Sequence, residues 1–254
     1  MHSDINIVGI KNHLKPNILK AYIEVLETVN STNDYLKNGL IKNGTLVVAK
    51  RQTNGKGRLG KTFLSDDGGI YMSLKIGFYD KSLLNLITPA VAVAVSKTLE
   101  RLCNIDTKIK WVNDIYALNK KLCGILTETI FDNNEGLSSV IIGIGINVDN
   151  NIQNDEIKNI ATSLFEITKQ NHDKSKIIAE IANEIFEQLK NLKDKTFLEY
   201  YKQKSLLLGK DITVIENENS YTAKALDIDD ECRLVIEKDG EIKKLFFGEV
   251  STKL

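Results

Sequence analysis

Residues 55–69 of the chain read GKGRLGKTFLSDDGG, and the part that follows the glycines decides the fold class. Gly55, Gly57 and Gly60 fit the dinucleotide-binding pattern GxGxxG, and residues 55–62 also fit the P-loop pattern GxxxxGK(S/T). Both patterns require a helix that begins directly after the loop, because its N-terminus binds phosphate. Residues 63–69 are instead typical of a turn, and a strand pattern follows them. The sequence therefore disfavours a doubly wound nucleotide-binding domain, and a P-loop NTPase stays only as an alternative.

The glycine loop is strongly cationic. Backbone N–H groups and a guanidinium together suit a phosphate or carboxylate ligand, since both accept charge-assisted hydrogen bonds. A solvated surface turn has a similar composition, so the loop alone does not predict an anion site. The cations in or beside it are Lys50, Arg51, Lys56, Arg58 and Lys61.

The bulk composition is that of a soluble globular chain. Of its 254 residues, 42% are hydrophobic and 27% charged, and the 34 Lys and Arg balance the 34 Asp and Glu. This balance disfavours bulk binding of nucleic acid, which requires a basic surplus. The three cysteines form no CxxC pair, so we expect idle, buried thiols rather than a zinc site or disulfides. No apolar run has the length of a signal peptide or membrane span, so we expect a cytoplasmic chain without membrane contact.

Patterns outside the loop predict an α+β domain with a mixed sheet and helices. The apolar segment 138–146 is predicted to be a strand buried on both faces, and 83–102 an amphipathic helix. Alternation and turn residues predict further strands, and helical spacing predicts further helices. The other strands are expected at 22–27, 45–50, 69–76, 107–110, 114–118 and 121–130, and the other helices at 33–37, 175–192 and 196–201.

After Gly209 the spacing of the apolar residues changes from the helical pattern to the pattern of short strands. Four short strand patterns, at 211–215, 221–227, 233–238 and 243–247, are about the content of a small SH3-like β-barrel. We therefore predict an N-terminal arm over residues 1–20, a catalytic domain over 21–205 and a C-terminal barrel over 206–254. The arm is too short for the three helices of a helix-turn-helix domain, so we expect no operator binding.

Three further segments carry polar residues at strand ends. They are Lys110-Trp-Val-Asn-Asp114, Lys121-Leu-Cys-Gly-Ile-Leu-Thr-Glu128 and Gly143-Ile-Gly-Ile-Asn147. Each has an ordinary structural explanation when taken alone. Trp111 is typical of a core, Lys121 of a solvated strand end and Asn147 of a turn.

In this order, and together with Ser31-Thr32-Asn33 and the glycine loop, the segments resemble the biotin protein ligases. The resemblance covers residues 22–254 and includes Gly248-Glu-Val-Ser251 near the C-terminus. It implies a fold like that of the class II aminoacyl-tRNA synthetases and biotin ligases, with an SH3-like C-terminal domain. Three positions depart from the family pattern: Lys56 replaces an arginine, Val112 a proline and Phe63 a frequent tryptophan.

The resemblance also implies an activity. The family uses ATP to convert biotin into biotinyl-5′-AMP, and a lysine of a biotin carboxyl carrier domain then takes the biotinyl group. The carrier belongs to a biotin-dependent carboxylase, and the enzyme is expected here in its monofunctional form. ATP and Mg²⁺ are the expected cofactors.

The site residues follow from the matched motifs. Lys121 and Arg58 are expected to be catalytic. Asp114 and Asn147 are candidate oxygen ligands for a Mg²⁺ ion carried by ATP. The expected biotin-binding residues are Ser31, Thr32, Asn33, Gln52, Lys56, Gly57, Arg58, Lys121 and Gly124, and those for ATP are Arg58, Asn113, Asp114, Lys121 and Asn147.

Other functions stay open at this point. A lipoate ligase or octanoyl transferase of related fold would need a longer apolar slot for its acyl chain. A bifunctional ligase–repressor would need an N-terminal DNA-binding domain, and a carrier-binding module would need no catalytic cations. The sequence leaves a monomer and a homodimer equally open.

Overall fold

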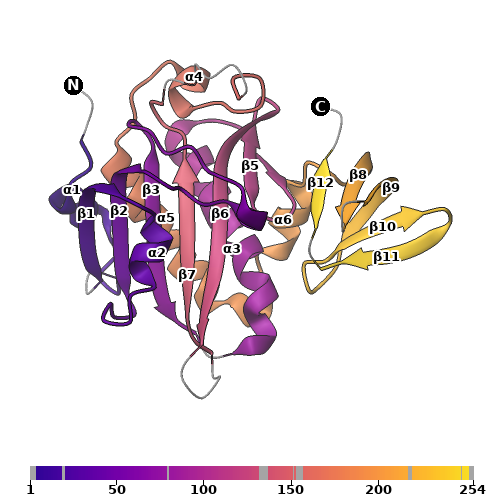
Figure 1. The fold of residues 1–254 in the computed structure, drawn as a ribbon, viewed down its shortest axis with the longest axis horizontal. Coiled ribbons are helices and arrows are strands. Elements are labelled where there is room, and N and C mark those ends of the chain that lie inside the picture. Colours follow the sequence, from indigo (N-terminus) through magenta and orange to yellow (C-terminus); the bar gives the residue numbers. More distant parts are fainter. Residues whose placement is uncertain are drawn as a thin grey trace.

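Two sheets organise the chain (Figure 1). The computed structural model describes residues 4–18, 21–78, 80–131, 137–150, 152, 157–216, 219–246 and 248–251. A seven-stranded sheet forms the large domain, and a five-stranded sheet forms the smaller C-terminal domain.

The large sheet is mixed, as predicted. Its strand order is β1-β2-β3-β7-β6-β5-β4, in which β1 and β2 are parallel and all other neighbours are antiparallel. The strands are β1 (Tyr22–Val29), β2 (Thr45–Gln52), β3 (Ile70–Gly77), β4 (Lys108–Lys110), β5 (Asp114–Ala117), β6 (Lys120–Phe131) and β7 (Leu137–Ile146).

Strand β7 lies in the middle of this sheet, and its burial on both faces is confirmed. Ile142 joins the main core on one face. Ile141 packs with Leu36 and Val47 on the other. Because both faces are covered, the strand is a nearly continuous apolar run rather than an alternating one.

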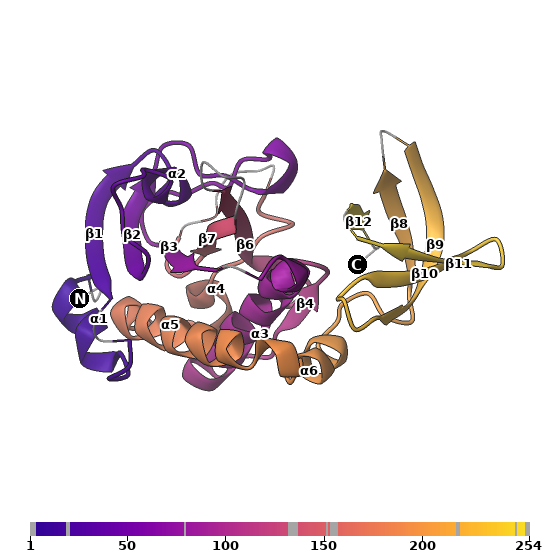
Figure 2. The same ribbon diagram turned by 90° about the horizontal axis from the view of Figure 1, so that it is seen from below.

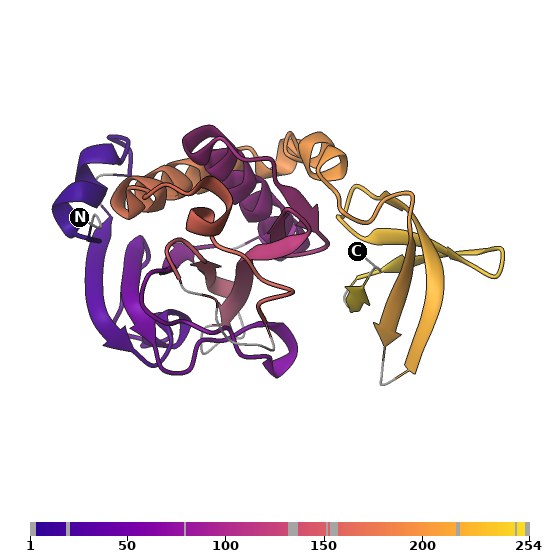
Figure 3. The ribbon, with the colours of Figure 1, turned by 90° about the horizontal axis from the view of Figure 1, so that it is seen from above.

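Helices cover the two faces of the sheet unequally. Figures 2 and 3 show α3 (Leu84–Cys103) and α5 (Lys174–Lys190) layered on one face, while the short α2 (Thr32–Leu36) lies on the other. Helices therefore cover the second face less completely than the first. The remaining helices are α1 (Ile7–His13), α4 (Leu164–Thr168) and α6 (Leu198–Gln203).

Helix α3 corrects one expectation from the sequence. Together with the turn before it, over Lys81–Cys103, it is long and apolar enough to cross a membrane, with a mean hydropathy of 1.4 in its most apolar window. However, 67% of that window is buried in the protein, and Val91 and Val95 are fully enclosed. Its apolar character therefore belongs to a core helix.

The N-terminal segment is docked on the large domain. Within it, α1 begins at Asn6, whose side chain accepts from Gly9 N at 2.8 Å. Ile10 is fully buried, and Asn183 of α5 donates to the carbonyl of His13 at 2.9 Å. A helix of seven residues with one buried side chain has no visible periodicity, which explains why the sequence indicated only an arm.

The C-terminal domain is an antiparallel, SH3-like sheet with strand order β11-β10-β9-β8-β12. It contacts the large domain through Trp111, whose indole donates to the carbonyl of Cys232 at 2.9 Å. All three cysteines are free and buried, as expected. Phe247, part of the fourth predicted strand, lies outside the described residues, and the last strand was not predicted separately. The strands are β8 (Asp211–Glu216), β9 (Asn219–Ile228), β10 (Leu234–Lys238), β11 (Glu241–Leu245) and β12 (Glu249–Ser251).

Glu100 joins the end of α3 to the segments that lead to the C-terminal domain. Its carboxylate accepts from Lys204 Nζ at 2.6 Å, from Thr107 N at 2.9 Å and from the Tyr200 hydroxyl at 2.9 Å. Burial would raise the pKa of Glu100, but these hydrogen bonds hold that pKa below its ordinary value. Its contribution to stability is therefore present above the ordinary pKa and is lost as the pH falls through the lowered one.

We expect Glu100→Gln to lower the free energy of unfolding by about 2 kcal/mol at neutral pH, because it weakens charge-assisted hydrogen bonds. The difference should shrink as the pH falls through the lowered pKa of Glu100, because the wild-type carboxyl is then itself protonated. Urea unfolding across this range measures both quantities. A difference that does not change with pH would contradict this account.

Candidate active site

A cavity of about 360 Å³ opens on the α2 face of the large sheet, below the glycine loop. The C-terminal domain closes one side of it through Gly248 and Val250. Every residue that the sequence predicted for the site lines this cavity. These are Ser31, Thr32, Asn33, Gln52, Lys56, Gly57, Arg58, Asn113, Asp114, Lys121, Gly124 and Asn147.

The glycine loop folds as a narrow hairpin. Gly57 N donates to the carbonyl of Lys61 at 2.7 Å, and Phe63 N donates to the carbonyl of Gly55 at 2.9 Å. The chain reverses at Leu59 and Gly60, both of which have a positive φ. No helix follows the loop before β3 begins. This confirms that the loop is neither a P-loop nor a dinucleotide-binding turn.

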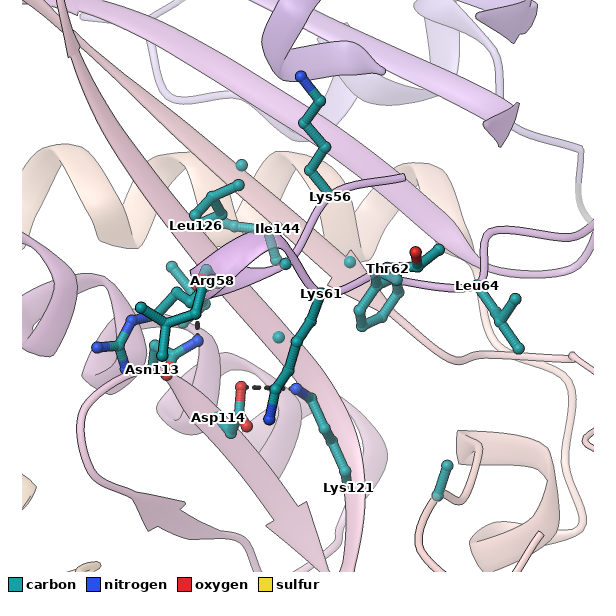
Figure 4. Close-up of a pocket in the computed structure, with 18 of the residues that line it drawn as sticks. Lys56, Arg58, Lys61, Thr62, Leu64, Asn113, Asp114, Lys121, Leu126 and Ile144 are labelled. Atoms are coloured by element: carbon teal, nitrogen blue, oxygen red, sulfur yellow. Dashed lines mark hydrogen bonds and ion pairs between the residues drawn. The ribbon is translucent and has the colours of Figure 1, made fainter. Parts of the chain in front are cut away.

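One end of the cavity is cationic. Lys121, near the start of β6, lies with Nζ 2.8 Å from Asp114 Oδ1. Arg58 donates to Asn113 Oδ1 at 3.1 Å. Figure 4 shows Lys61 pointing from the loop toward the same carboxylate as Lys121. This end therefore has the three cations Lys121, Arg58 and Lys61 and the single carboxylate of Asp114, and the excess of positive charge suits a polyanionic ligand.

Backbone contacts fix the positions of two of these cations, Arg58 through Asn113 and Lys121 directly. Asn113 donates its side-chain amide to the carbonyl of Ile125 at 2.9 Å, so its oxygen faces Arg58. Lys121 N donates to the carbonyl of Ile160 at 2.8 Å, and Thr162 N donates to the carbonyl of Lys121 at 2.9 Å. The cationic end is therefore built on strands β5 and β6 rather than on the loop alone.

The other end of the cavity is a neutral polar wall. Gln52 accepts from Thr32 N at 2.8 Å and donates to Ser65 Oγ at 2.9 Å. Ser31 caps α2 and accepts from Asp34 N at 3.4 Å. All of these groups carry no charge, so they suit a neutral ligand with hydrogen-bonding groups of its own.

A glycine pair separates the two ends. Gly124 of β6 and Gly145 of β7 are register partners in the sheet. A side chain at either position would press against the ring of Phe63, which lies over both. The Lys121 ammonium is 5.9 Å from the centre of this ring. The pair therefore forms a flat floor that brings an aromatic ring close to the catalytic lysine expected from the sequence.

Two predicted residues line the cavity but direct their polar groups elsewhere. Lys56 points away from the cationic end (Figure 4) and forms an ion pair with Asp34 of α2 at 2.6 Å. The side-chain nitrogen of Asn33 donates to Glu128 Oε2 at 2.8 Å, and its side-chain oxygen accepts from Ser73 at 2.6 Å. The predicted parts of Lys56 and Asn33 in binding biotin therefore stay predictions.

Several lining residues were missing from the predicted site. Ile157, Ile160 and Ala161 come from a segment without a sequence pattern, and Gly248 and Val250 come from the other domain. Only tertiary structure brings these residues to the cavity. Phe63 and Lys61 belong to the loop itself and carried a signal, since both follow the glycines directly.

Gly143 gives a prediction for the polar wall. A side chain at this position would overlap the amide oxygen of Asn33, so Gly143→Ala should displace Asn33 and lower ligand affinity at least about tenfold. Gly39→Ala is the matched control, because a methyl group there meets no atom within 4 Å. Isothermal titration calorimetry with the ligand measures the effect. Equal affinity of the two variants would contradict it.

The sequence matches known family profiles over both domains. The Biotin/lipoate A/B protein ligase family matches residues 25–147, and the Biotin protein ligase C terminal domain matches residues 207–253. The bifunctional ligase/repressor BirA of Bacillus subtilis is 34% identical over 252 residues, which cover 95% of this chain and 76% of that protein. The chain belongs to the biotin protein ligase family. It is therefore a ligase.

Solved structures agree with this membership. The biotin protein ligase of Aquifex aeolicus, in complex with biotin and ATP, has a TM-score of 0.78 and 34% identity, and the match covers 91% of this ligase and 97% of that chain. Among relatives found by sequence, the biotin–[acetyl-CoA-carboxylase] ligase of Mycobacterium tuberculosis is 26% identical, with 90% of this chain and 88% of that protein covered.

Proposed function

We propose that this ligase activates biotin with ATP and transfers the biotinyl group to a lysine of a biotin carboxyl carrier domain. The observation that carries the proposal is the division of one cavity into a neutral polar wall and a cationic end. Biotin has the matching division, with a neutral ureido ring and a carboxylate. The similar Aquifex enzyme, solved with biotin and ATP, supports the same assignment.

The ureido ring is placed at the polar wall. It offers two N–H donors and one carbonyl acceptor. Thr32, Gln52 and Ser31 supply the complementary groups, and Gly57 and Gly124 leave space for the ligand. This position directs the carboxylate of biotin toward Lys121.

In the first step, a carboxylate oxygen of biotin attacks the α-phosphorus of ATP. The bond to the β-phosphate oxygen breaks, and pyrophosphate leaves. Two anions must approach each other, so the barrier falls when cations stand where negative charge builds up. Lys121 is positioned to contact the carboxylate and α-phosphate, while Arg58 and Lys61 face the phosphates.

The residues present are compatible with Mg²⁺ that arrives on ATP. Within the described part of the chain, no group of three His, Cys, Asp or Glu side chains could hold a metal by itself. Mg²⁺ bound to a triphosphate keeps several waters and needs only one or two protein oxygens. Asp114 and Asn147 are the candidates for these, and the ion would neutralise phosphate charge. Asn113 is placed to contact the nucleotide.

In the second step, the amine of a carrier lysine attacks the acyl carbon of biotinyl-5′-AMP. An amide bond forms, the acyl–phosphate bond breaks, and AMP leaves. Water would hydrolyse this mixed anhydride, so the site must exclude it. The loop over residues 55–63 covers the cavity and is suited to this task.

The test is biotin-dependent exchange of radiolabelled pyrophosphate into ATP, followed by transfer of biotin to a carrier domain. Octanoate and lipoate serve as competing substrates, because the matched family also includes lipoate ligases. Exchange that depends on biotin alone supports the proposal. Exchange with the acyl chains but not biotin would show the related activity, and no exchange with any of them would show a binding module.

A further inference from the structure

A three-residue turn, residues 111–113, joins β4 to β5 and carries part of the cationic end of the cavity. Asn113, the last residue of the turn, accepts from Arg58 at 3.1 Å. Asp114, which follows directly, lies 2.8 Å from Lys121. The position of this turn therefore sets the position of two side chains that are candidates for binding the nucleotide.

Both ends of the turn are tied to other parts of the protein. At its start, the Trp111 indole donates to the carbonyl of Cys232 in the C-terminal domain at 2.9 Å. At its end, Asn113 donates its side-chain amide to the carbonyl of Ile125 at 2.9 Å, and its own carbonyl accepts from Ile125 N at 3.0 Å. These contacts leave the middle residue, Val112, to be held separately.

The side chain that holds the middle of the turn does not line the cavity. It is Tyr201 of α6, whose hydroxyl donates to the carbonyl of Val112 at 3.0 Å. Tyr201 is only 1% exposed, so its hydroxyl needs a partner within the protein. Burial also raises the pKa of this hydroxyl well above its ordinary value. The hydroxyl therefore keeps its proton and remains a donor to Val112.

Tyr201 also lies close to the charged groups of the site. After burial and the neighbouring Cys232, the groups that act on the pKa of its hydroxyl are Arg58, which lowers that pKa, and Asp114, which raises it. Both of these side chains line the cavity. Because such charge effects weaken with distance, they place Tyr201 close behind the cationic end.

We infer that Tyr201 is a positioning residue for the nucleotide end of the site, and that it acts through the carbonyl of Val112. Its hydroxyl fixes the middle of the turn, so that Asn113 and Asp114 stay where ATP would meet them. The inference rests on the proposed function. It assigns a part in that function to a residue of α6, outside the cavity and outside every motif singled out in the sequence.

The experiment compares Tyr201→Phe with the wild type in biotin-dependent pyrophosphate exchange. The variant keeps the ring but removes the donor, so ATP must order a turn that is no longer held in place. The KM for ATP should therefore rise about fivefold, the scale of one ordinary hydrogen bond. The rate at saturation and the KM for biotin should each stay within about twofold of the wild-type value, because only binding of the nucleotide depends on the turn.

Tyr200→Phe is the matched control. It makes the same change at the next position of α6, and the hydroxyl that it removes also makes hydrogen bonds within the protein, at 2.9 Å to Ser96 and at 2.9 Å to Glu100. These partners lie on α3 rather than on the turn, and Tyr200 does not line the cavity. The control should therefore keep the wild-type KM for ATP even where it lowers stability.

If the wild type catalyses exchange and Tyr201→Phe has the same KM for ATP, the inference is wrong while the proposed function stands. A KM that rises equally for ATP and biotin, or equally in the two variants, would also overturn the inference, because a general loosening has no preference for the nucleotide. Should Tyr201→Phe not fold in urea-unfolding controls, 4-fluorophenylalanine at this position fills the place of the hydroxyl without donating, and the same selective rise is expected. A wild type without biotin-dependent exchange would overturn the proposed function, and this inference with it.

Discussion

Lys121→Ala should reduce the rate of biotin-dependent pyrophosphate exchange about a thousandfold, the scale of losing one well-placed cation in phosphoryl transfer. Lys121 lies 2.8 Å from Asp114, and in the proposed reaction it stands where the carboxylate of biotin meets the α-phosphate of ATP. Its loss leaves one cation fewer to balance the charge that builds up in the transition state. Biotin affinity should change much less, since we propose that the ureido ring binds at the opposite end of the cavity. Rapid-quench kinetics and calorimetry separate the two quantities.

The control for this variant is Lys190→Ala, at the exposed end of α5. It removes the same charge from a position that does not line the cavity and should retain full activity. Full activity in Lys121→Ala would refute the catalytic assignment. A loss confined to biotin affinity, with an unchanged exchange rate at saturation, would make Lys121 a binding residue instead.

Those parts of the fold that depend on local pattern were predictable from the sequence. The apolar run of β7 indicated burial on both faces, and residues 63–69 excluded the helix that a P-loop needs. The change in the spacing of apolar residues after Gly209, from helical to strand-like, indicated a separate β domain. In each case a few neighbouring residues contain the whole signal, because side-chain period and turn chemistry are local properties.

The direction of individual polar groups was not predictable in the same way. Lys56 belongs to the cationic loop, yet its ion pair with Asp34 of α2 turns it away from the cationic end of the site. Asn33 belongs to a motif expected to bind ligand, yet Ser73 and Glu128 occupy its amide. Both outcomes depend on partners that are distant in the sequence. Motif position therefore predicted which residues line the cavity, but not which partners their polar groups have within the protein.

Arg58→Ala should weaken binding of a non-hydrolysable biotinyl-adenylate analogue about a hundredfold, for two separable reasons. In the proposed complex, the guanidinium is a charge-assisted donor to the phosphate, a contact typically worth about 1.5–3 kcal/mol. It also ties the loop to the strands, through its 3.1 Å hydrogen bond to Asn113. Calorimetry with the analogue measures the total loss.

Asn113→Ala separates these two contributions, because it removes the tie and keeps the guanidinium. If the phosphate contact dominates, Asn113→Ala should lose no more than about tenfold in affinity, the scale of one ordinary hydrogen bond. If closure of the loop dominates, Arg58→Ala and Asn113→Ala should lose the same amount of affinity for the analogue. The geometry favours the first result, since Asn113 is itself held by Ile125 and the hairpin of the loop is stabilised by its own backbone bonds. Equal losses would place the main contribution of Arg58 in holding the loop closed rather than in contacting the phosphate.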